Sequence, residues 1–173
     1  MKTPLAQMLI RTAQLDTRFT TASKLNARSS PLGGTFGKVR SHAHRPHQGW
    51  DLYATVGTPV FAIATGKVAL VRTKGVSDYG LQICIHFTDE ERAKPYPKGL
   101  YAFYGHLLQT FVHKHEEVQE GQVIGLTGTS GNAFNTPPHL HFEIRTLAYP
   151  GRGLTGRIDP GEILGYQYYS CSA

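Results

Sequence analysis

The sequence is poor in features that would fix a cellular compartment or a membrane anchor. It has two cysteines among 173 residues, Cys84 and Cys171. Cys84 lies in an apolar run and is expected to be a small buried side chain. Whether it pairs with Cys171 is left open, because two cysteines do not decide the redox compartment. No stretch approaches the roughly 18 apolar residues that a membrane-spanning helix needs, so we expect no transmembrane segment.

The chain also lacks a dense block of one charge. Its 18 Lys and Arg against 12 Asp and Glu give a net charge of +6, but the basic residues are spread along the sequence. Such a balance attracts polyanions, including nucleic acid, anionic membrane surfaces and acidic wall polymers. No aromatic and basic motif of a nucleic-acid-binding module accompanies the charge. A basic nucleic-acid-binding β protein is therefore the weakest hypothesis, and we expect no nucleic acid as a partner.

Glycine and proline are abundant, with 19 and 10 copies, and they separate short runs rich in Val, Ile, Tyr and Phe. Residues of these types favour strands, and the glycines supply tight turns. The runs cover residues 51–57, 58–66, 67–75, 81–87, 100–107, 121–128 and 139–145. This pattern of short runs predicts one mostly β domain with antiparallel strands, folded as a sandwich or partly open barrel.

Residues 1–28 carry the best helical pattern of the chain. Apolar residues recur there at spacings near three and four, at Leu5, Met8, Leu9, Ala13 and Leu15. Thr3 suits an N-cap and Pro4 the first helical position. We therefore expect a short N-terminal helix within a leader of residues 1–30, followed by the main domain at residues 31–173.

Two histidines share the segment His139-Leu-His141-Phe-Glu143. In a strand, side chains two apart emerge on one face about 6–7 Å from each other, so both imidazoles can face one cleft. Such a pair is a common way to build a metal site, although two histidines on a solvent face would show the same pattern. Glu143 lies on the same face by parity, and we favour a supporting contact or an ion pair for it over catalysis.

His47 and Asp51 stand four residues apart, a spacing that also returns to one face of a strand. An imidazole nitrogen and a carboxylate oxygen suit zinc, and a catalytic zinc keeps one position open for water. The alternative is a hydrogen-bonded surface pair near a turn. Most of the other histidines are expected at the surface, namely His42, His44, His113 and His115, whereas His86 alternates with apolar residues and faces a cleft or solvent.

Several blocks occur in an order that resembles the lysostaphin-type (LytM-like) zinc endopeptidases. They are HQGWD at 47–51, GTPVFAIATGKV at 57–68, YGHL at 104–107, VQEGQVIGLTGTSG at 118–131 and PHLHFE at 138–143. The resemblance spans roughly residues 33–146, and the ordered set is far more specific than any one block. Two segments are longer than in the family, 131–138 before the histidine pair and the loop 88–99, and the first is expected to reshape a groove wall.

The resemblance implies a role for each matching residue. His47, Asp51 and His141 correspond to the ligands of one Zn²⁺ per chain, and His106 and His139 to two catalytic histidines that flank the metal. We assign the general base to His139 and oxyanion stabilisation to His106, with an exchange of the two roles left open. The family fold is a two-layer, mostly antiparallel β structure with a substrate groove. A regulator of wall enzymes that has lost activity is the alternative, but its hallmark is missing metal residues, and all five positions are present here.

By resemblance, the substrate is the peptide part of bacterial peptidoglycan, either stem cross-links or glycine-rich bridges. This places the expected site of action in the cell envelope, in the periplasm or the extracellular wall. Residues 1–19 have no sustained apolar core of about 7–15 residues as a secretory signal would, and Arg11 interrupts them. Either a signal is missing from this chain, or the protein leaves by another route, for instance as a toxin. A carrier or immunity protein would then be the expected partner.

Overall fold

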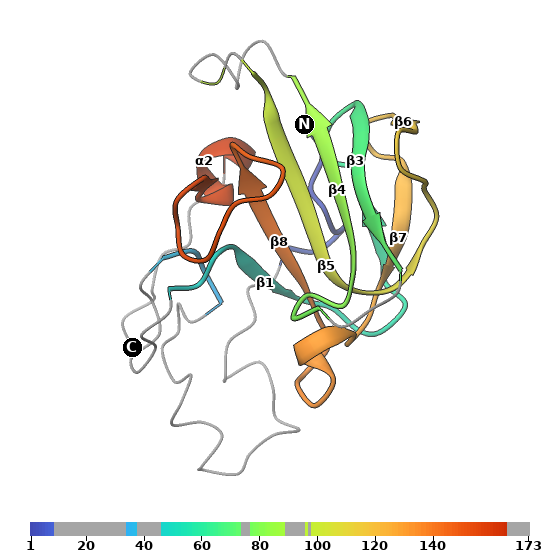
Figure 1. Ribbon diagram of the computed structural model, residues 1–173. Helices are drawn as coiled ribbons and strands as arrows, with labels where there is room; N and C mark the ends of the chain where they lie inside the picture. Colours follow the sequence, from blue (N-terminus) through green and yellow to red (C-terminus); the bar gives the residue numbers. More distant parts are fainter. Residues whose placement is uncertain (9–33, 38–45, 74–76, 89–95, 97, 166–173) are drawn as a thin grey trace.

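The computed structural model describes residues 1–8, 34–37, 46–73, 77–88, 96 and 98–165. In this part of the chain nine strands form one open antiparallel sheet (Figure 1). The strands are β1 (Trp50–Tyr53), β2 (Pro59–Phe61), β3 (Gly66–Arg72), β4 (Leu81–Phe87), β5 (Leu100–Thr110), β6 (Glu117–Val118), β7 (Val123–Thr127), β8 (His139–Arg145) and β9 (Arg157–Ile158). A 3₁₀ turn, η3 (Gly131–Ala133), precedes β8, and a short helix, α2 (Pro160–Leu164), follows β9. The predicted mostly β, antiparallel fold is confirmed.

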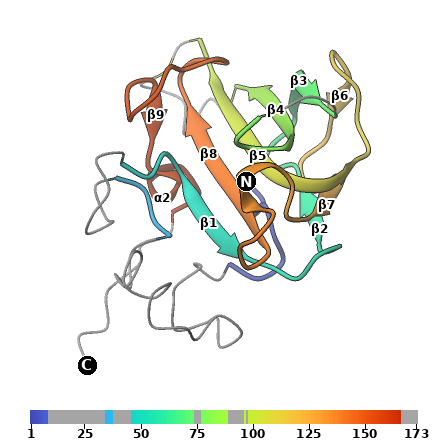
Figure 2. The same cartoon turned by 60° about the horizontal axis from the view of Figure 1, so that its bottom comes forward.

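Strand β8 positions most of the polar side chains of interest. It lies between β1 and β5 in the strand order β1-β8-β5-β4-β3-β6, and β7 branches from β5 and pairs with β2 (Figures 1 and 2). All seven residues of β8 are buried. Leu140, Phe142 and Ile144 point into the hydrophobic core, so His139 and His141 emerge on the opposite face, as the period of two requires.

Strand β5 changes partners half way along its length. Residues 101–105 pair with β8, whereas residues 107–110 pair with β7. The register against β4 slips between these halves, which marks a β-bulge around Gly105 and His106. His106 there has a φ of 61°, a left-handed conformation that is uncommon for a residue with a side chain. The bulge turns His106 toward the face that bears His139. Such backbone distortions concentrate at functional sites.

The N-terminal helix prediction is wrong for residues 1–8. This segment forms no helix, because its backbone pairs with the chain beside β2 instead. Lys2 N donates to Ile63 O at 2.9 Å, and Phe61 N donates to Pro4 O at 2.9 Å. Leu5 is 1% exposed and belongs to the hydrophobic core. Tertiary burial of one leucine and the open hydrogen bonds of β2 thus outweigh a modest helical propensity, while residues 9–28 of the predicted helix lie outside the described residues.

Most predicted strands are found close to their predicted bounds, including β4 and β8 at their full length. The sequence pattern did not indicate the two-residue strands β6 and β9 or the helix α2. Cys84 is fully buried, as expected, whereas Cys171 lies outside the described residues and the pairing stays untested. No helix in the described ranges is long and apolar enough to cross a membrane.

The close approach of the chain before β1 to β8 depends on Gly49. A Cβ added there would lie 2.2 Å from the carbonyl oxygen of Phe142 and 2.7 Å from Cγ of Glu143. We expect Gly49→Ala to force these segments apart and to lower the free energy of unfolding by about 1–3 kcal/mol, as overpacking does. Denaturant unfolding measures this. Gly151→Ala is the matched control, because its added Cβ meets nothing within 4 Å, and equal midpoints for the two variants would contradict the prediction.

Candidate metal centre and active site

His47, Asp51 and His141 present three ligand atoms to one point. Asp51 on β1 pairs directly with His141 on β8, and His47 lies just before β1, where it forms an isolated bridge with Gly37. Asp51 Oδ1 lies 3.1 Å from His47 Nε2 and 2.9 Å from His141 Nδ1, and the two nitrogens are 3.3 Å apart. Two ligands of a tetrahedral zinc lie about 3.3 Å apart at ordinary bond lengths. The separations therefore suit three ligands of a single small cation.

The proton positions on the two imidazoles support the same conclusion. His47 Nδ1 lies 2.8 Å from the carbonyl oxygen of Thr35, which can only accept, so Nδ1 carries the proton. His141 Nε2 lies 2.9 Å from a carboxylate oxygen of Glu143 and must donate in the same way. When both rings are neutral, His47 Nε2 and His141 Nδ1 each bear a lone pair, and these lone pairs face each other and the Asp51 carboxylate. Three converging acceptors favour a cation between them, and second partners of this kind are typical of metal-bound histidines.

The charges around Asp51 stabilise an ionised carboxylate at the centre of this cluster. Burial alone would raise the pKa of Asp51, but His47, His139 and His141 around it hold that pKa well below its usual value. Burial opposes the protonation of His141, yet its bonds to Asp51 and Glu143 outweigh burial and raise its pKa. All three side chains, those of His47, Asp51 and His141, are about 5% exposed. The chain therefore buries an ionised carboxylate that needs positive charge beside it.

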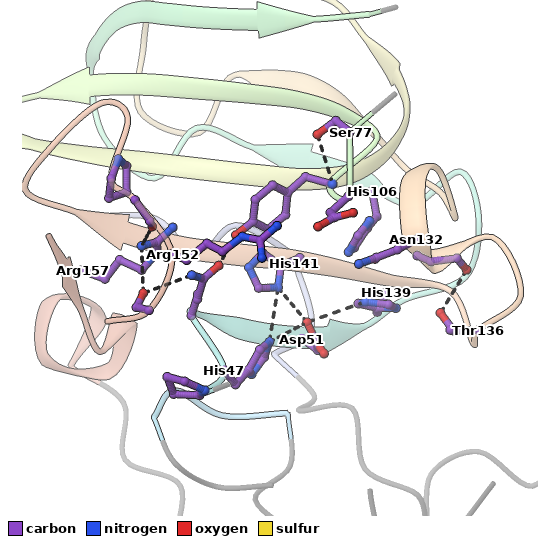
Figure 3. Close-up of a pocket in the computed structure, with 18 residues that line it drawn as sticks. His47, Asp51, Ser77, His106, Asn132, Thr136, His139, His141, Arg152 and Arg157 are labelled. Atoms are coloured by element: carbon purple, nitrogen blue, oxygen red, sulfur yellow. Dashed lines mark hydrogen bonds and ion pairs between the residues drawn. The ribbon is translucent and has the colours of Figure 1, made fainter. Parts of the chain in front are cut away.

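His106 and His139 lie beside the three candidate ligand residues. His139 Nδ1 lies 2.8 Å from the carbonyl oxygen of Pro137, and His106 Nδ1 lies 2.9 Å from that of Ser130. Each Nδ1 is therefore a donor, and each Nε2 bears the lone pair when the ring is neutral. The two rings are 4.9 Å apart between centroids, and His139 Nε2 lies 3.7 Å from Asp51 Oδ1 (Figure 3). Two proton-accepting nitrogens thus stand next to the candidate metal position.

Glu143 is the centre of a hydrogen-bonding network that joins the candidate ligand His141 to Arg145 and Arg157. It is completely buried, and its second oxygen accepts from Arg145 Nε and Arg157 Nε, each at 2.7 Å. Burial alone would raise the pKa of Glu143, but the bond from His141 and the charge of Arg145 lower it far below its usual value. The expected supporting role is what the geometry shows: Glu143 orients His141 and compensates two arginines.

A pocket of about 730 Å³ is lined by the five candidate residues, His47, Asp51, His106, His139 and His141 (Figure 3). Its other lining residues are Pro46, Gln48, Ser77, Asp78, Tyr79, Asn132, Ala133, Thr136, Pro150, Gly151, Arg152, Gly153 and Arg157. The segment 131–138 forms part of the wall, as expected from its length. The other loop expected to be longer, 88–99, contributes none of its described residues, and residues 89–95 and 97 lie outside the described part.

Sequence reasoning missed Tyr79. Its ring lies 5.1 Å from that of His141, and its backbone carbonyl accepts from His106 N at 2.7 Å. Burial and the nearby Glu143 raise the pKa of Tyr79, so its hydroxyl stays protonated and donates to Gln48 Oε1. No periodicity or motif marks position 79, which lies in a loop. Gln48, in contrast, stands inside the block at 47–51 and could have been found there.

Among the histidines that the structure describes, His86, His113 and His115 do not line the pocket. His113 and His115 are exposed, as expected, and His86 is half-buried with Nε2 2.8 Å from the carbonyl oxygen of Lys98. His42 and His44 lie outside the described residues.

The lowered pKa of Glu143 gives a prediction for acid stability. A carboxylate whose folded pKa lies below its unfolded value near 4.5 stabilises the fold above that pH, and the stabilisation is lost as pH falls. For metal-free protein we expect the free energy of unfolding to drop between about pH 5 and pH 3. The drop should be smaller by on the order of 2 kcal/mol in Glu143→Gln. Denaturant unfolding across this range measures it, with exposed Glu162→Gln as control; identical pH slopes for Glu143→Gln and the unmodified chain would contradict the prediction.

Comparisons with known proteins agree with this geometry. The sequence profile of peptidase family M23 matches residues 45–160, which include all five candidate residues. The chain is 34% identical over 122 residues to the DD-carboxypeptidase/endopeptidase Mpg of Neisseria meningitidis, across 70% of this chain and 25% of that protein. It is 35% identical over 98 residues to lysostaphin of Staphylococcus simulans, across 56% and 17% respectively. The chain thus spans about a quarter or less of these curated relatives.

Solved structures show the same similarity in three dimensions. The catalytic domain of the antimicrobial peptidase lysostaphin from Staphylococcus simulans superposes with a TM-score of 0.59 at 28% identity, covering 76% of this chain and 90% of that one. The catalytic domain of the prophage-encoded M23 protein EnpA from Enterococcus faecalis gives a TM-score of 0.56 at 28% identity, covering 73% and 85%. With a profile match over most of its length, this chain belongs to peptidase family M23 and is a homologue of lysostaphin-type, LytM-like endopeptidases.

Proposed function

We propose that this chain is a zinc-dependent endopeptidase that hydrolyses peptide bonds of bacterial peptidoglycan. The observation that carries the proposal is the set of three buried acceptor atoms on His47, Asp51 and His141, within 4.8 Å of one another. The relatives supply the substrate class, since one of them is the peptidoglycan DD-endopeptidase ShyA of Vibrio cholerae, 30% identical over 113 residues. Because such a substrate lies outside the cytoplasmic membrane, we place the activity in the cell envelope.

His47, Asp51 and His141 would hold one zinc ion, which supplies Lewis-acid polarisation of the scissile carbonyl and acidifies a water molecule. His139 then acts as general base and acid: its Nε2 lone pair accepts a proton from the attacking water and returns it to the leaving amine. Its 3.7 Å distance from Asp51 Oδ1 supports this assignment. His106 holds the tetrahedral oxyanion, and because Nδ1 donates to Ser130, Nε2 can do so only when protonated.

No observation favours the alternative of a regulator that has lost activity. Each of the five residues expected to be missing in such a protein is present and converges on the pocket. The nucleic-acid hypothesis rests only on the net charge of +6.

Digestion of purified peptidoglycan followed by mass spectrometry tests the proposal, because it detects activity and names the bond together. We expect zinc-loaded protein to release fragments with new peptide amino and carboxyl ends, and chelated protein to release none. Fragments cut only in the glycan strand, or none at all from zinc-loaded protein, would contradict the proposed function.

A further inference from the structure

The loop between β8 and β9, residues 146–156, forms one end of the pocket. It contributes four lining residues, Pro150, Gly151, Arg152 and Gly153. Its base is closed by Thr146 N donating to Gly156 O at 3.0 Å and by Arg157 N donating to Leu154 O at 3.0 Å. The loop is therefore a built wall of the site.

The two residues that flank Arg152 are fixed by side chains of the site. Arg157 Nη1 donates to the carbonyl oxygens of Gly151 at 2.8 Å and Gly153 at 2.9 Å. Gln48 Nε2 donates to the same Gly153 carbonyl at 3.1 Å. Arg157 is itself held by Glu143, which bonds the ligand His141. A chain of hydrogen bonds thus ties the backbone on both sides of residue 152 to the metal centre.

Arg152 is the available cation of this pocket. Arg157 Nε donates to Glu143, and Arg157 Nη1 donates to the loop carbonyls. Arg145 bonds Glu143 and lies 3.6 Å over the ring of Phe103. Arg152 is exposed and lines the pocket, and within the described residues no acceptor is bonded to its guanidinium. A guanidinium whose backbone is fixed at a pocket wall, and which bonds no acceptor among the described residues, is suited to bind a ligand.

The position of Arg152 gives the pocket a direction. Figure 3 shows Arg152 and Arg157 on one side of His141 and His139, with Asn132 and Thr136 on the other. A peptide whose scissile bond lies at the histidines therefore extends toward Arg152 on one side only. The opposite side offers a hydroxyl and an amide group and, beside Asn132, the exposed Asp78, whose backbone oxygen accepts from Asn132 N at 2.9 Å.

We propose that Arg152 binds an ionised carboxylate of the substrate next to the scissile amide and so selects stem cross-links over glycine bridges. The inference rests on the proposed peptidase function and deepens it. Arginine recognises a carboxylate through two parallel hydrogen bonds, a geometry that a neutral amide does not match. A cross-link that passes through a diamino acid places a free carboxylate beside the amide, whereas the interior of a glycine bridge has none.

The test uses two synthetic cross-linked peptides that differ only in this group, carboxylate in one and carboxamide in the other. For zinc-loaded protein we expect kcat/KM to favour the carboxylate by about 10-fold, mainly through KM, as one charge-assisted pair provides. In Arg152→Ala the ratio should fall toward 1, and Arg152→Lys should retain part of it. Arg72→Ala, an exposed arginine on β3 outside the pocket, should keep the full ratio.

Binding of both peptides to the zinc-loaded His139→Ala protein, measured by calorimetry, separates this inference from the proposed function. A preference for the carboxylate that disappears when Arg152→Ala is added supports the subsite even if the peptides are not cleaved. No preference for the carboxylate peptide in the His139→Ala protein would overturn the subsite. Equal losses of affinity for both peptides when Arg152→Ala is added would also overturn it. Cleavage of both peptides at equal rates would overturn the subsite while leaving the peptidase function intact.

Discussion

Replacing Asp51 with alanine is expected to remove zinc from the protein and to lower peptidoglycan hydrolysis by a factor on the order of 10³ or more, the loss of several kcal/mol of metal assistance. Asp51 Oδ1 is the atom that both ligand nitrogens approach, at 3.1 and 2.9 Å. Without it, two neutral imidazoles remain, and they hold a divalent cation far less tightly than the full set. Elemental analysis of the purified variant, together with its rate on peptidoglycan, measures both effects.

Asp78→Asn is the matched control, because Asp78 is an exposed acid of the same pocket outside the ligand set. It should keep one zinc per chain. His47→Ala and His141→Ala should behave like Asp51→Ala. Zinc retained by His141→Ala but lost from His139→Ala would show that the two histidines of β8 have been assigned in the wrong order.

Replacing His139 with alanine is expected to lower kcat by about 10²–10⁴-fold while zinc stays bound, the range of a lost general base. The reason is geometric. His139 Nδ1 is committed to the Pro137 carbonyl, and its Nε2 lies 3.7 Å from Asp51, beside the ligands. Three protein ligands and one water complete a tetrahedron, so no fourth histidine is needed to hold the metal.

His106→Ala provides the comparison within the same pocket. It should also keep zinc and lose most of its turnover, because His106 approaches His139 from the bulge in β5. Full activity in either variant at one zinc per chain would remove that histidine from the mechanism. Zinc loss in both would instead make them ligands.

Much of the site follows from residue spacing alone. The alternation along β8 correctly places His139, His141 and Glu143 on one face, opposite the core residues Leu140 and Phe142. This worked because residues 139–145 form one regular strand, in which successive side chains point to opposite faces. The antiparallel partners then add what spacing cannot, since the pairing of Asp51 with His141 is a long-range contact.

The spacing argument for His47 and Asp51 correctly brought the two side chains together, but its assumption about the strand was wrong. The prediction placed both on one strand, but β1 begins at Trp50 and His47 precedes it. The chain turns at Gly49, where only hydrogen fits against Phe142 O. His47 therefore reaches the site from an isolated bridge with Gly37.

Other features depend on tertiary contacts that no local pattern contains. The left-handed backbone of His106 arises where β5 leaves β8 for β7, so its direction could not be read from a strand template. Arg152 stands in a loop whose place is fixed by Arg157 and Gln48, far apart in sequence. The segment around Leu5 is not helical despite its pattern, because Leu5 is buried in the hydrophobic core.

Titration of metal-stripped protein with zinc, with cleavage of purified peptidoglycan as the readout, tests the central claim most directly. The arrangement of His47, Asp51 and His141 predicts that activity is absent without metal, rises linearly with added zinc and breaks sharply at one equivalent per chain. Activity that persists after the metal is stripped, or that shows no break at one equivalent, would contradict the account.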